Sequence, residues 1–305
     1  DGTGNICSCL PDGTDFQQHT EHAGFFARFA TTDGNRIVYT VAGELWHFDP
    51  TTGESAAVEV SYASPRTQLN RKFVDAQDYL SGWALHPKGH SIVATARGKL
   101  FTFGNWEGAV RQHGETQGVR YRLPLYIEDG KRVVVVGEGE GEERLEVHTC
   151  DGSEPMRVLT TGDIGRATAL LMSPDEKWLT LTNHRHELVF VEMASGEMRV
   201  GDRSPCLGID GFDWSPDSRW VAYAVHDTWK TGLIRIIDTR DWAIRDLTEP
   251  GFKDSSPCFD PEGRYLYFVS SRWFDPVYDS LFFEISFPKS AKPCVVTLKE
   301  DRESL

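Results

Sequence analysis

Four short apolar runs between Phe212 and Thr248, separated by turn residues, constrain the fold of this chain more than any other feature. The first two runs flank Ser215-Pro216-Asp217-Ser218. Proline fixes φ at the first central position of a turn and aspartate folds back on its own backbone, so these two runs form a hairpin. Two further runs, Leu233–Ile237 and the more polar Ile244–Thr248, complete the stretch. Four antiparallel strands in one period predict a propeller blade.

The same hairpin turn recurs along the chain. It is found at Asp33-Gly34, Lys88-Gly89, Asp129-Gly130, Asp175-Glu176, Asp217-Ser218 and Glu262-Gly263. Successive turns are 55, 41, 46, 42 and 45 residues apart, and a period in the forties with four strands per period is typical of propellers. We therefore predict an all-β fold, a β-propeller with four-stranded antiparallel blades, comprising about six full blades plus one half blade.

The first strand of each blade lies innermost in a propeller. We expect these strands to start near Phe29, Trp83, Leu123, Ala169, Phe212 and Cys258. Residues 5–20 match only the third and fourth strands of the pattern and give the half blade. Cys294–Leu298 is expected to complete the last blade.

The spacing of 55 residues is longer than the others, and its extra residues fall between Val60 and Asp78, where no blade strand is needed. Residues 61–77 are therefore interpreted as a linker or a domain boundary. A long loop between consecutive blades explains the spacing equally well.

Charge and hydropathy exclude two classes of partner. The formal net charge is −14 and no segment gathers Lys or Arg, so we expect no nucleic-acid partner. No apolar run approaches the ~18 residues that span a bilayer, and no leader with a basic and an apolar region opens the chain, so we expect no membrane. Asp1 falls inside a strand pattern, which indicates a piece of a longer protein.

The six cysteines are scattered, mostly within expected strands, and predict reduced, packed thiols and a cytoplasmic location. They are Cys7, Cys9, Cys150, Cys206, Cys258 and Cys294. Cys7 and Cys9 point to one face of a strand, yet a structural zinc site needs four ligands, and His19 and His22 lie outside the usual spacings. We expect packing here and no metal.

Candidate catalytic motifs are few. The sequence contains no Gly-x-Ser-x-Gly elbow and no phosphate-binding glycine pattern, so we predict no catalytic residue and no cofactor within these residues. His184-Arg185-His186-Glu187 places two imidazoles at alternate positions that could share a metal. The segment lies at an expected turn between the second and third strands of a blade, so a role in an interface or in loop packing is favoured.

Most tryptophans are expected to pack between neighbouring blades, where a propeller buries its large side chains. This group is Trp46, Trp83, Trp106, Trp178, Trp214, Trp220 and Trp273. Trp229 and Trp242 lie near loops. Two interpretations stay open for each of them: contact with a partner protein, or ordinary exposure to solvent.

Four arginines near the expected first strands, Arg28, Arg120, Arg122 and Arg166, are candidate pore-mouth residues. First strands line the central channel, so their ends could place positive charge where the C-terminal carboxylate of a peptide is attracted. Solvated or blade-bridging arginines are the alternative.

Particular segments, beyond the period, resemble the tricorn family of serine peptidases. They are Gly4–Cys9 with Pro11–Gly13, Gly43–Pro50, Asp163–Arg166, Asn183–Glu187 and the run from Phe259 to Asp279. The resemblance implies a six-bladed propeller followed by a seven-bladed propeller, a PDZ-like domain and two catalytic domains. Residues 1–60 then correspond to the closing blades of the first propeller, and residues 78–305 to the first five blades of the second.

The resemblance also implies a function. The nucleophilic serine and the histidine of the family have no counterparts here, so the chain is expected to be a non-catalytic segment of a serine-type hydrolase that gates or guides oligopeptides toward a catalytic centre elsewhere. Its implied partners are oligopeptides, the remaining domains of the parent peptidase and, as a homo-oligomer, further copies that form a hexamer. The alternative is a free-standing interaction scaffold of the TolB or WD-repeat kind, which the length of the open reading frame distinguishes.

Overall fold

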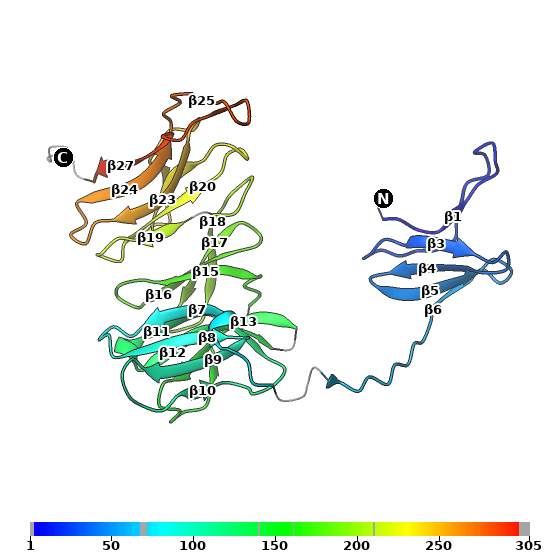
Figure 1. Ribbon diagram of the computed structural model, residues 1–305, viewed down its shortest axis with the longest axis horizontal. Coiled ribbons are helices and arrows are strands. Elements are labelled where there is room, and N and C mark those ends of the chain that lie inside the picture. Colours follow the sequence, from blue (N-terminus) through cyan, green and yellow to red (C-terminus); the bar gives the residue numbers. More distant parts are fainter. Residues whose placement is uncertain (1–2, 68–71, 140, 161, 210, 299–305) are drawn as a thin grey trace. The chain divides into compact units, whose positions relative to one another are not determined.

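A computed structural model describes residues 3–67, 72–139, 141–160, 162–209 and 211–298. The chain divides into two compact units, residues 1–73 and 74–305. Strands, turns and short 3-10 segments make up the described residues, as Figure 1 shows. None of their helices is long and apolar enough to cross a membrane. The expectation for Asp1 lies outside the described residues.

The first unit contains a two-stranded and a four-stranded antiparallel sheet. The strands are β1 (Cys7–Ser8) and β2 (Gln17–Gln18), then β3 (Arg28–Thr32), β4 (Ile37–Val41), β5 (Glu44–Asp49) and β6 (Glu54–Ala57). Tyr39 and Phe48 are buried with Ile6 in a core that joins the two sheets. The half blade and the full blade predicted for this region are therefore present.

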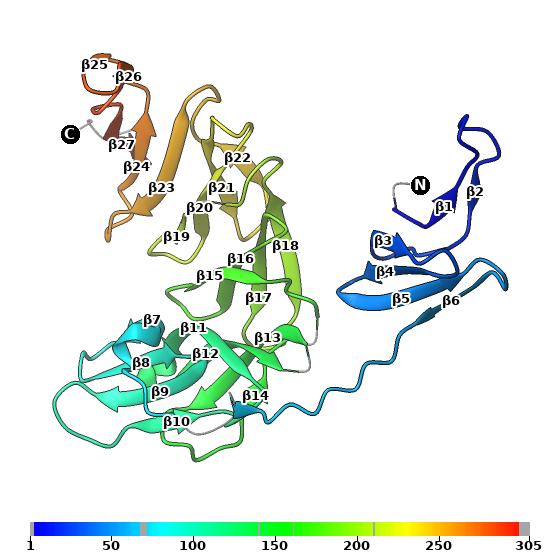
Figure 2. The ribbon, with the colours of Figure 1, turned by 45° about the vertical axis from the view of Figure 1, so that its right-hand side comes forward.

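The described residues of the second unit form five successive antiparallel sheets of three or four strands and one separate two-stranded sheet. Four of them have four strands: β7 (Leu80–Leu85), β8 (Ser91–Ala96), β9 (Lys99–Gly104) and β10 (Arg111–His113); β11 (Arg120–Ile127), β12 (Arg132–Gly139), β13 (Glu142–Thr149) and β14 (Arg157–Val158); β15 (Ala167–Met172), β16 (Trp178–Asn183), β17 (Glu187–Glu192) and β18 (Met198–Arg203); β19 (Phe212–Trp214), β20 (Trp220–Val225), β21 (Leu233–Asp238) and β22 (Ile244–Asp246). Figure 2 shows the first strand of each sheet on the inner side of an arc and β10, β14, β18 and β22 on its outer side.

Each pair of neighbouring sheets in this unit shares a buried apolar layer. Val93 and Tyr121 join the first two sheets, and Val136 and Leu181 lie in the layer between the second and third. Equivalent layers join the third sheet to the fourth and the fourth to the fifth. Sheets stacked face to face around an arc, with the first strand innermost, are the architecture of a propeller, and the predicted fold class is confirmed.

The turn chemistry explains why each hairpin forms where the sequence places it. In the turn after β19, the Ser215 hydroxyl donates to Asp217 at 2.5 Å and accepts from the backbone NH of Trp220 at 2.8 Å. Ser173 makes the same pair of bonds with Asp175 and Trp178. A side chain that satisfies the polar groups of a turn favours reversal over extension.

The last sheet departs from the predicted pattern. Up to Leu298, where the description ends, it has three strands, β23 (Lys253–Phe259), β24 (Tyr265–Ser271) and β27 (Ala291–Thr297), while β25 (Val277–Asp279) and β26 (Glu284–Ser286) form a separate hairpin. Cys294 pairs with Phe268, so β27 takes the third place beside β24. The expectation that Cys294–Leu298 completes the last blade is wrong, because residues 272–290 leave the sheet.

The predicted first strands are β3, β7, β11, β15, β19 and β23, and Phe29, Trp83, Leu123, Ala169 and Phe212 all lie in them. Cys258 lies near the end of β23 and not at its start. Several of these strands carry a bulge: the register shifts between Arg122 and Leu125, and Leu123 has a φ of 53°. A bulge turns a strand locally and redirects its side chains.

Candidate functional site

A positively charged notch lies beside the start of β11, at the end of the sheets where the first strands begin. It has a volume of about 570 Å³, and its charged lining consists of Arg97, Lys99, Arg120 and Glu138. Within the described part of the chain, neither Arg97 nor Arg120 makes an ion pair with a carboxylate. Three cations against one carboxylate make this notch a candidate site for an anion, and a guanidinium presents donors that match a carboxylate.

Local structure fixes the notch. Arg97 and Gly98 form the two-residue turn between β8 and β9, with φ values of 50° and 72°, as the tight hairpin turns of twisted strands require. The carbonyl oxygen of Gly98 accepts from the NH of Tyr121 at 2.9 Å, which holds the turn against β11. Lys99 donates to the carbonyl oxygen of Thr116, and the Arg97 guanidinium lies 5.5 Å from the Tyr79 ring centroid.

Arg122, the second candidate on β11, joins two sheets. Its guanidinium donates to Glu143 at 2.5 Å and to the carbonyl oxygen of Ala167 at 2.9 Å. Glu143 also accepts from the NH of Ala167 at 2.8 Å. Arg122 is therefore a blade-bridging arginine, the alternative that the sequence left open, and its charge is compensated.

Arg166 directly precedes β15, and its side chain is exposed. Its backbone NH donates to Nδ1 of His184 at 2.9 Å, which fixes the turn and leaves the guanidinium unused by that contact. Nearby, Arg185 pairs with Asp163, and this bond, with a second from the NH of Gly165, lowers the pKa of the Asp163 carboxyl. Arg166 therefore lies near both a cation, Arg185, and a carboxylate, Asp163.

Arg28 belongs to the first unit. It begins β3 and lines a pocket of about 420 Å³ with Phe25, Phe26 and Phe29. Its guanidinium lies 5.6 Å from the Phe26 ring centroid. The structure thus brings Arg122 and the backbone of Arg166 to one seam and places Arg120 in the notch. That these arginines line a channel stays a prediction.

The segment His184–Glu187 is engaged in structural contacts. Glu187 accepts hydrogen bonds from Asn183 at 2.8 Å and from Arg203. Burial opposes ionisation of Glu187, but these bonds outweigh it and lower the pKa of the carboxyl. No group of three or more potential metal ligands is found in the described ranges. The favoured role in loop packing agrees with these contacts.

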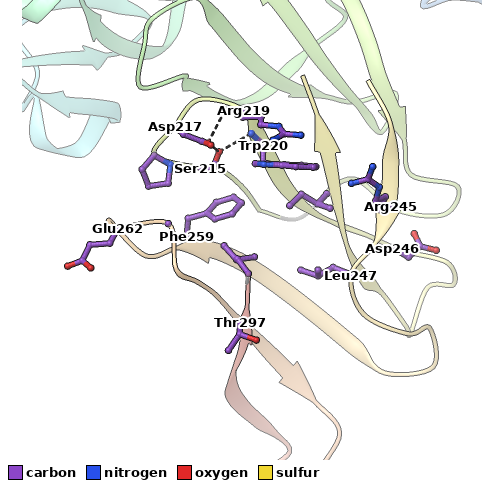
Figure 3. A pocket seen from close by; sticks show the side chains of 14 residues that line it. Ser215, Asp217, Arg219, Trp220, Arg245, Asp246, Leu247, Phe259, Glu262 and Thr297 are labelled. Atoms are coloured by element: carbon purple, nitrogen blue, oxygen red, sulfur yellow. Dashed lines mark hydrogen bonds between the residues drawn. The ribbon is translucent and has the colours of Figure 1, made fainter. Parts of the chain in front are cut away.

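A second cavity, of about 680 Å³, lies between the fourth and fifth sheets of the second unit (Figure 3). The guanidinium groups of Arg219 and Arg245 lie over the Trp220 ring, 4.5 and 5.6 Å from its centroid. Phe259 and Leu247 add apolar surface. The Ser215 hydroxyl is engaged in its turn, and no histidine lines the cavity, so its lining suits recognition of an apolar or aromatic group.

Two groups of sequence predictions need correction. Trp83 and Trp106 are 65% and 90% exposed, because Trp83 lies on the first sheet of its unit and Trp106 in a turn after β9. Trp242 is partly buried and packs against the core beside Phe190, with ring centroids 5.0 Å apart, whereas Trp229 is exposed. Among the free cysteines, Cys7, Cys9 and Cys258 are exposed and not packed.

The notch contains two residues that sequence reasoning missed, Arg97 and Lys99. The signal was the tripeptide Arg97-Gly98-Lys99 between two apolar runs, since glycine favours a two-residue hairpin turn and such a turn presents its flanking side chains at the end of a blade.

Comparison with known proteins identifies the family. The model of the tricorn protease second beta propeller domain matches residues 80–305. The chain belongs to the tricorn protease family. It is 34% identical over 298 residues to a putative tricorn-like protease C-terminal subunit of Sulfurisphaera tokodaii, covering 98% of this chain and 34% of the relative. It is 35% identical over 304 residues to tricorn protease homolog 1 of Streptomyces coelicolor, covering 98% of this chain and 28% of the relative.

The fold comparison agrees with this tricorn assignment. The crystal structure of the tricorn protease matches with a TM-score of 0.70 at 24% identity, over 100% of this chain and 30% of that chain. The chain therefore spans about a third of the length of the tricorn relatives it matches. The fold of this chain is therefore similar to the propeller fold of the tricorn protease.

Proposed function

We propose that this chain is the non-catalytic propeller segment of a longer tricorn-like serine peptidase, and that it guides oligopeptides toward a catalytic centre outside these residues. The observation that carries the proposal is the notch at the start of β11, where Arg97, Lys99 and Arg120 lie with Glu138 as the one carboxylate among the described lining residues. A peptide entering by its C-terminus presents a carboxylate, and two guanidinium groups that form no ion pair with a described carboxylate attract it. The inner arc of first strands then provides a path for an extended chain.

The proposal includes the domain organisation. Residues 1–60 are assigned to the closing blades of a six-bladed propeller, residues 61–77 to a linker and residues 78–305 to the first five blades of a seven-bladed one. The family match over residues 80–305 and the division into units at residues 73 and 74 support this assignment. By the same resemblance, the parent enzyme is proposed to be a cytoplasmic hexamer.

The test uses the full-length peptidase and pairs of peptides that differ only in a free or an amidated C-terminus. Arg120→Glu removes one cation from the notch and adds an anion. We expect kcat/KM for the free-acid peptides to fall about tenfold, equivalent to about 1.4 kcal/mol, and to change little for the amides. Added salt should reduce the difference between the two peptides in the wild-type enzyme.

Arg157→Glu is the matched control, because Arg157 is an exposed arginine on the outer strand β14. It should leave both kinds of peptide unaffected. Equal losses for the free acid and the amide in Arg120→Glu, or the same selective loss in Arg157→Glu, would refute a carboxylate-attracting role for the notch.

A further inference from the structure

The hairpin β25–β26 is an addition to the last sheet of the second unit. In the other four sheets of this unit the second and third strands are joined by two to seven residues, whereas here the connection runs from Arg272 to Ser290. Val277 pairs with Ser286, Tyr278 with Ile285 and Asp279 with Glu284. Figure 1 shows β25 beyond the upper ends of β23 and β24.

Large apolar side chains on this hairpin are in contact with water. Those exposed by more than half are Phe274, Tyr278, Leu281, Phe282, Phe283 and Ile285, and Phe283 reaches 77%. Tyr278 and Ile285 are cross-strand partners, so their side chains share one face of the ribbon. Phe287 follows on that face by alternation and contacts Phe274 edge to face, with ring centroids 5.7 Å apart. These four side chains form an apolar face on one side of the ribbon, and the exposed Leu281, Phe282 and Phe283 lie in the turn that joins its two strands.

We expect a stably bound partner to cover this apolar face. Strands of three residues in a two-stranded ribbon are not stable by themselves in water, and the internal support of this hairpin is limited to contacts such as the bond from the NH of Leu281 to Asp279 at 2.8 Å. A contiguous apolar patch of several large side chains marks a protein interface, and a patch left bare promotes aggregation. A partner that binds only transiently would leave it bare for most of the time.

Charge defines the partner further. Asp279 and Glu284 lie directly opposite each other at the tip of the hairpin, and like charges in this arrangement repel. Neither carboxylate forms an ion pair with a cation in the part of the chain that the structure describes. A partner surface with an apolar centre and an Arg or Lys beside these two carboxylates would relieve the repulsion and bury the face together.

We propose that the hairpin β25–β26 is a docking element for another domain of the same polypeptide, outside residues 1–305, with an apolar surface and a basic residue opposite Asp279 and Glu284. The tricorn relatives are about three times as long as this chain, so most of their residues lie outside the matched region. A second copy of this piece fits less well, because its net charge of −14 places a further acidic surface against the acidic tip. This inference rests on the proposal that the chain is part of a longer peptidase, but not on the channel function.

A photo-crosslink in the full-length peptidase tests the proposal. The photoreactive residue p-benzoylphenylalanine replaces Phe283, or, as a control, Phe16, which is 70% exposed in the first unit. Protomers labelled with ¹⁴N and ¹⁵N are mixed before irradiation, and the crosslinked peptides are identified by mass spectrometry. We expect position 283 to crosslink, within one protomer, to a domain other than this propeller, outside residues 1–305. Crosslinks between protomers, crosslinks confined to residues 1–305 or to the remaining blades of this propeller, or a yield no higher than at position 16 would overturn it.

A charge reversal tests the stated chemistry of the partner. In the full-length protein, Glu284→Lys should raise amide hydrogen exchange of residues 274–287 and of the crosslinked segment about tenfold, while Glu284→Gln should raise it less. Glu197→Lys, at an exposed turn after β17, is the matched control and should change neither. Unchanged exchange in Glu284→Lys would contradict a basic partner residue. Exchange of β20 and β21 serves as the internal measure that the blades remain folded.

Discussion

The guanidinium of Arg122 on β11 donates to the carbonyl oxygen of Ala167, the first residue of β15 in the next sheet, at 2.9 Å. Glu143 binds the same guanidinium and also accepts from the NH of Ala167. The first strands of two blades are therefore joined by one carboxylate and one arginine. At one end of the seam between these two blades, the Arg122–Glu143 ion pair joins them, and over the rest of the seam apolar side chains pack together.

Arg122→Met should weaken this seam. The Glu143 side chain is only 9% exposed, so removal of its cation leaves a nearly buried carboxylate with a single remaining donor. We expect a loss of about 2–4 kcal/mol in the free energy of unfolding of the second unit. Urea denaturation followed by circular dichroism measures it. Arg132→Met, whose partners Glu128 and Glu154 are 46% and 59% exposed, should cost less than about 1 kcal/mol, and equal losses would contradict the argument.

Gly130 is expected to be intolerant of a side chain. It has a φ of 85°, and a Cβ built there would lie 1.9 Å from Nε2 of the buried His86. Gly130→Ala should therefore cost about 2–4 kcal/mol, from backbone strain and steric overlap together. Gly89→Ala separates the two causes, because Gly89 has a φ of 73° and no atom within 4 Å of the added Cβ. Thermal denaturation should show the larger loss at Gly130.

Two tryptophans that the sequence grouped together should behave differently. Trp242 lies among aromatic rings, 5.3 Å from Trp178 and 5.0 Å from Phe190, with the guanidinium of Arg199 4.4 Å from its centroid. Trp242→Ala should cost about 2–4 kcal/mol of unfolding free energy. Trp229→Ala removes a ring that is 72% exposed and should change stability by less than about 0.5 kcal/mol. A comparable loss in both variants would mean that Trp229 also packs.

The strand order of the blades follows from local signals that the sequence displays. Turns such as Ser215–Ser218 contain the atoms that stabilise them, so each hairpin is specified within about ten residues. The recurrence of these turns then predicts the propeller. The resemblance of short segments to tricorn peptidases predicted the family in the same way, because those segments are local too.

Features that depend on contacts between blades were not predictable from the same signals. The roles of Arg122 and Arg120 differ although they lie two residues apart, because only Arg122 reaches Glu143 and the next sheet. The apolar run from Val277 to Phe287 has strand-like composition, yet it leaves the blade while Cys294 pairs with Phe268. The roles of the two arginines and the path of the Val277–Phe287 segment both depend on the register between strands that lie far apart in the chain. Hydropathy alone does not predict that register.

The histidine pair between the first two blades of the second unit predicts a loss of stability in mild acid. His113 is buried, bonds to the Thr102 hydroxyl at 2.7 Å, and lies with its ring centroid 6.4 Å from that of His148. Burial, with the nearby charges of His148 and Arg111, lowers the pKa of His113 from 6.5 to about 4. The folded state therefore keeps this imidazole neutral in a range where the unfolded chain binds a proton.

The sign of the effect follows from these pKa values. Because the unfolded state binds more protons between pH 6.5 and about 4, the stabilising contribution is complete above pH 6.5, falls as the pH drops toward about 4, and is constant below that value. The total loss is about 3 kcal/mol. His113→Gln retains a partner for Thr102 and does not titrate, so its urea midpoint should vary less over this range. Glu146 does not explain a slope above about pH 4.5. Burial raises the pKa of its carboxyl, but hydrogen bonds from His148 and Arg144 outweigh burial and lower that pKa, so Glu146 loses its stabilising contribution only below about pH 4.5. An unchanged slope in His113→Gln would therefore show that another group governs acid sensitivity.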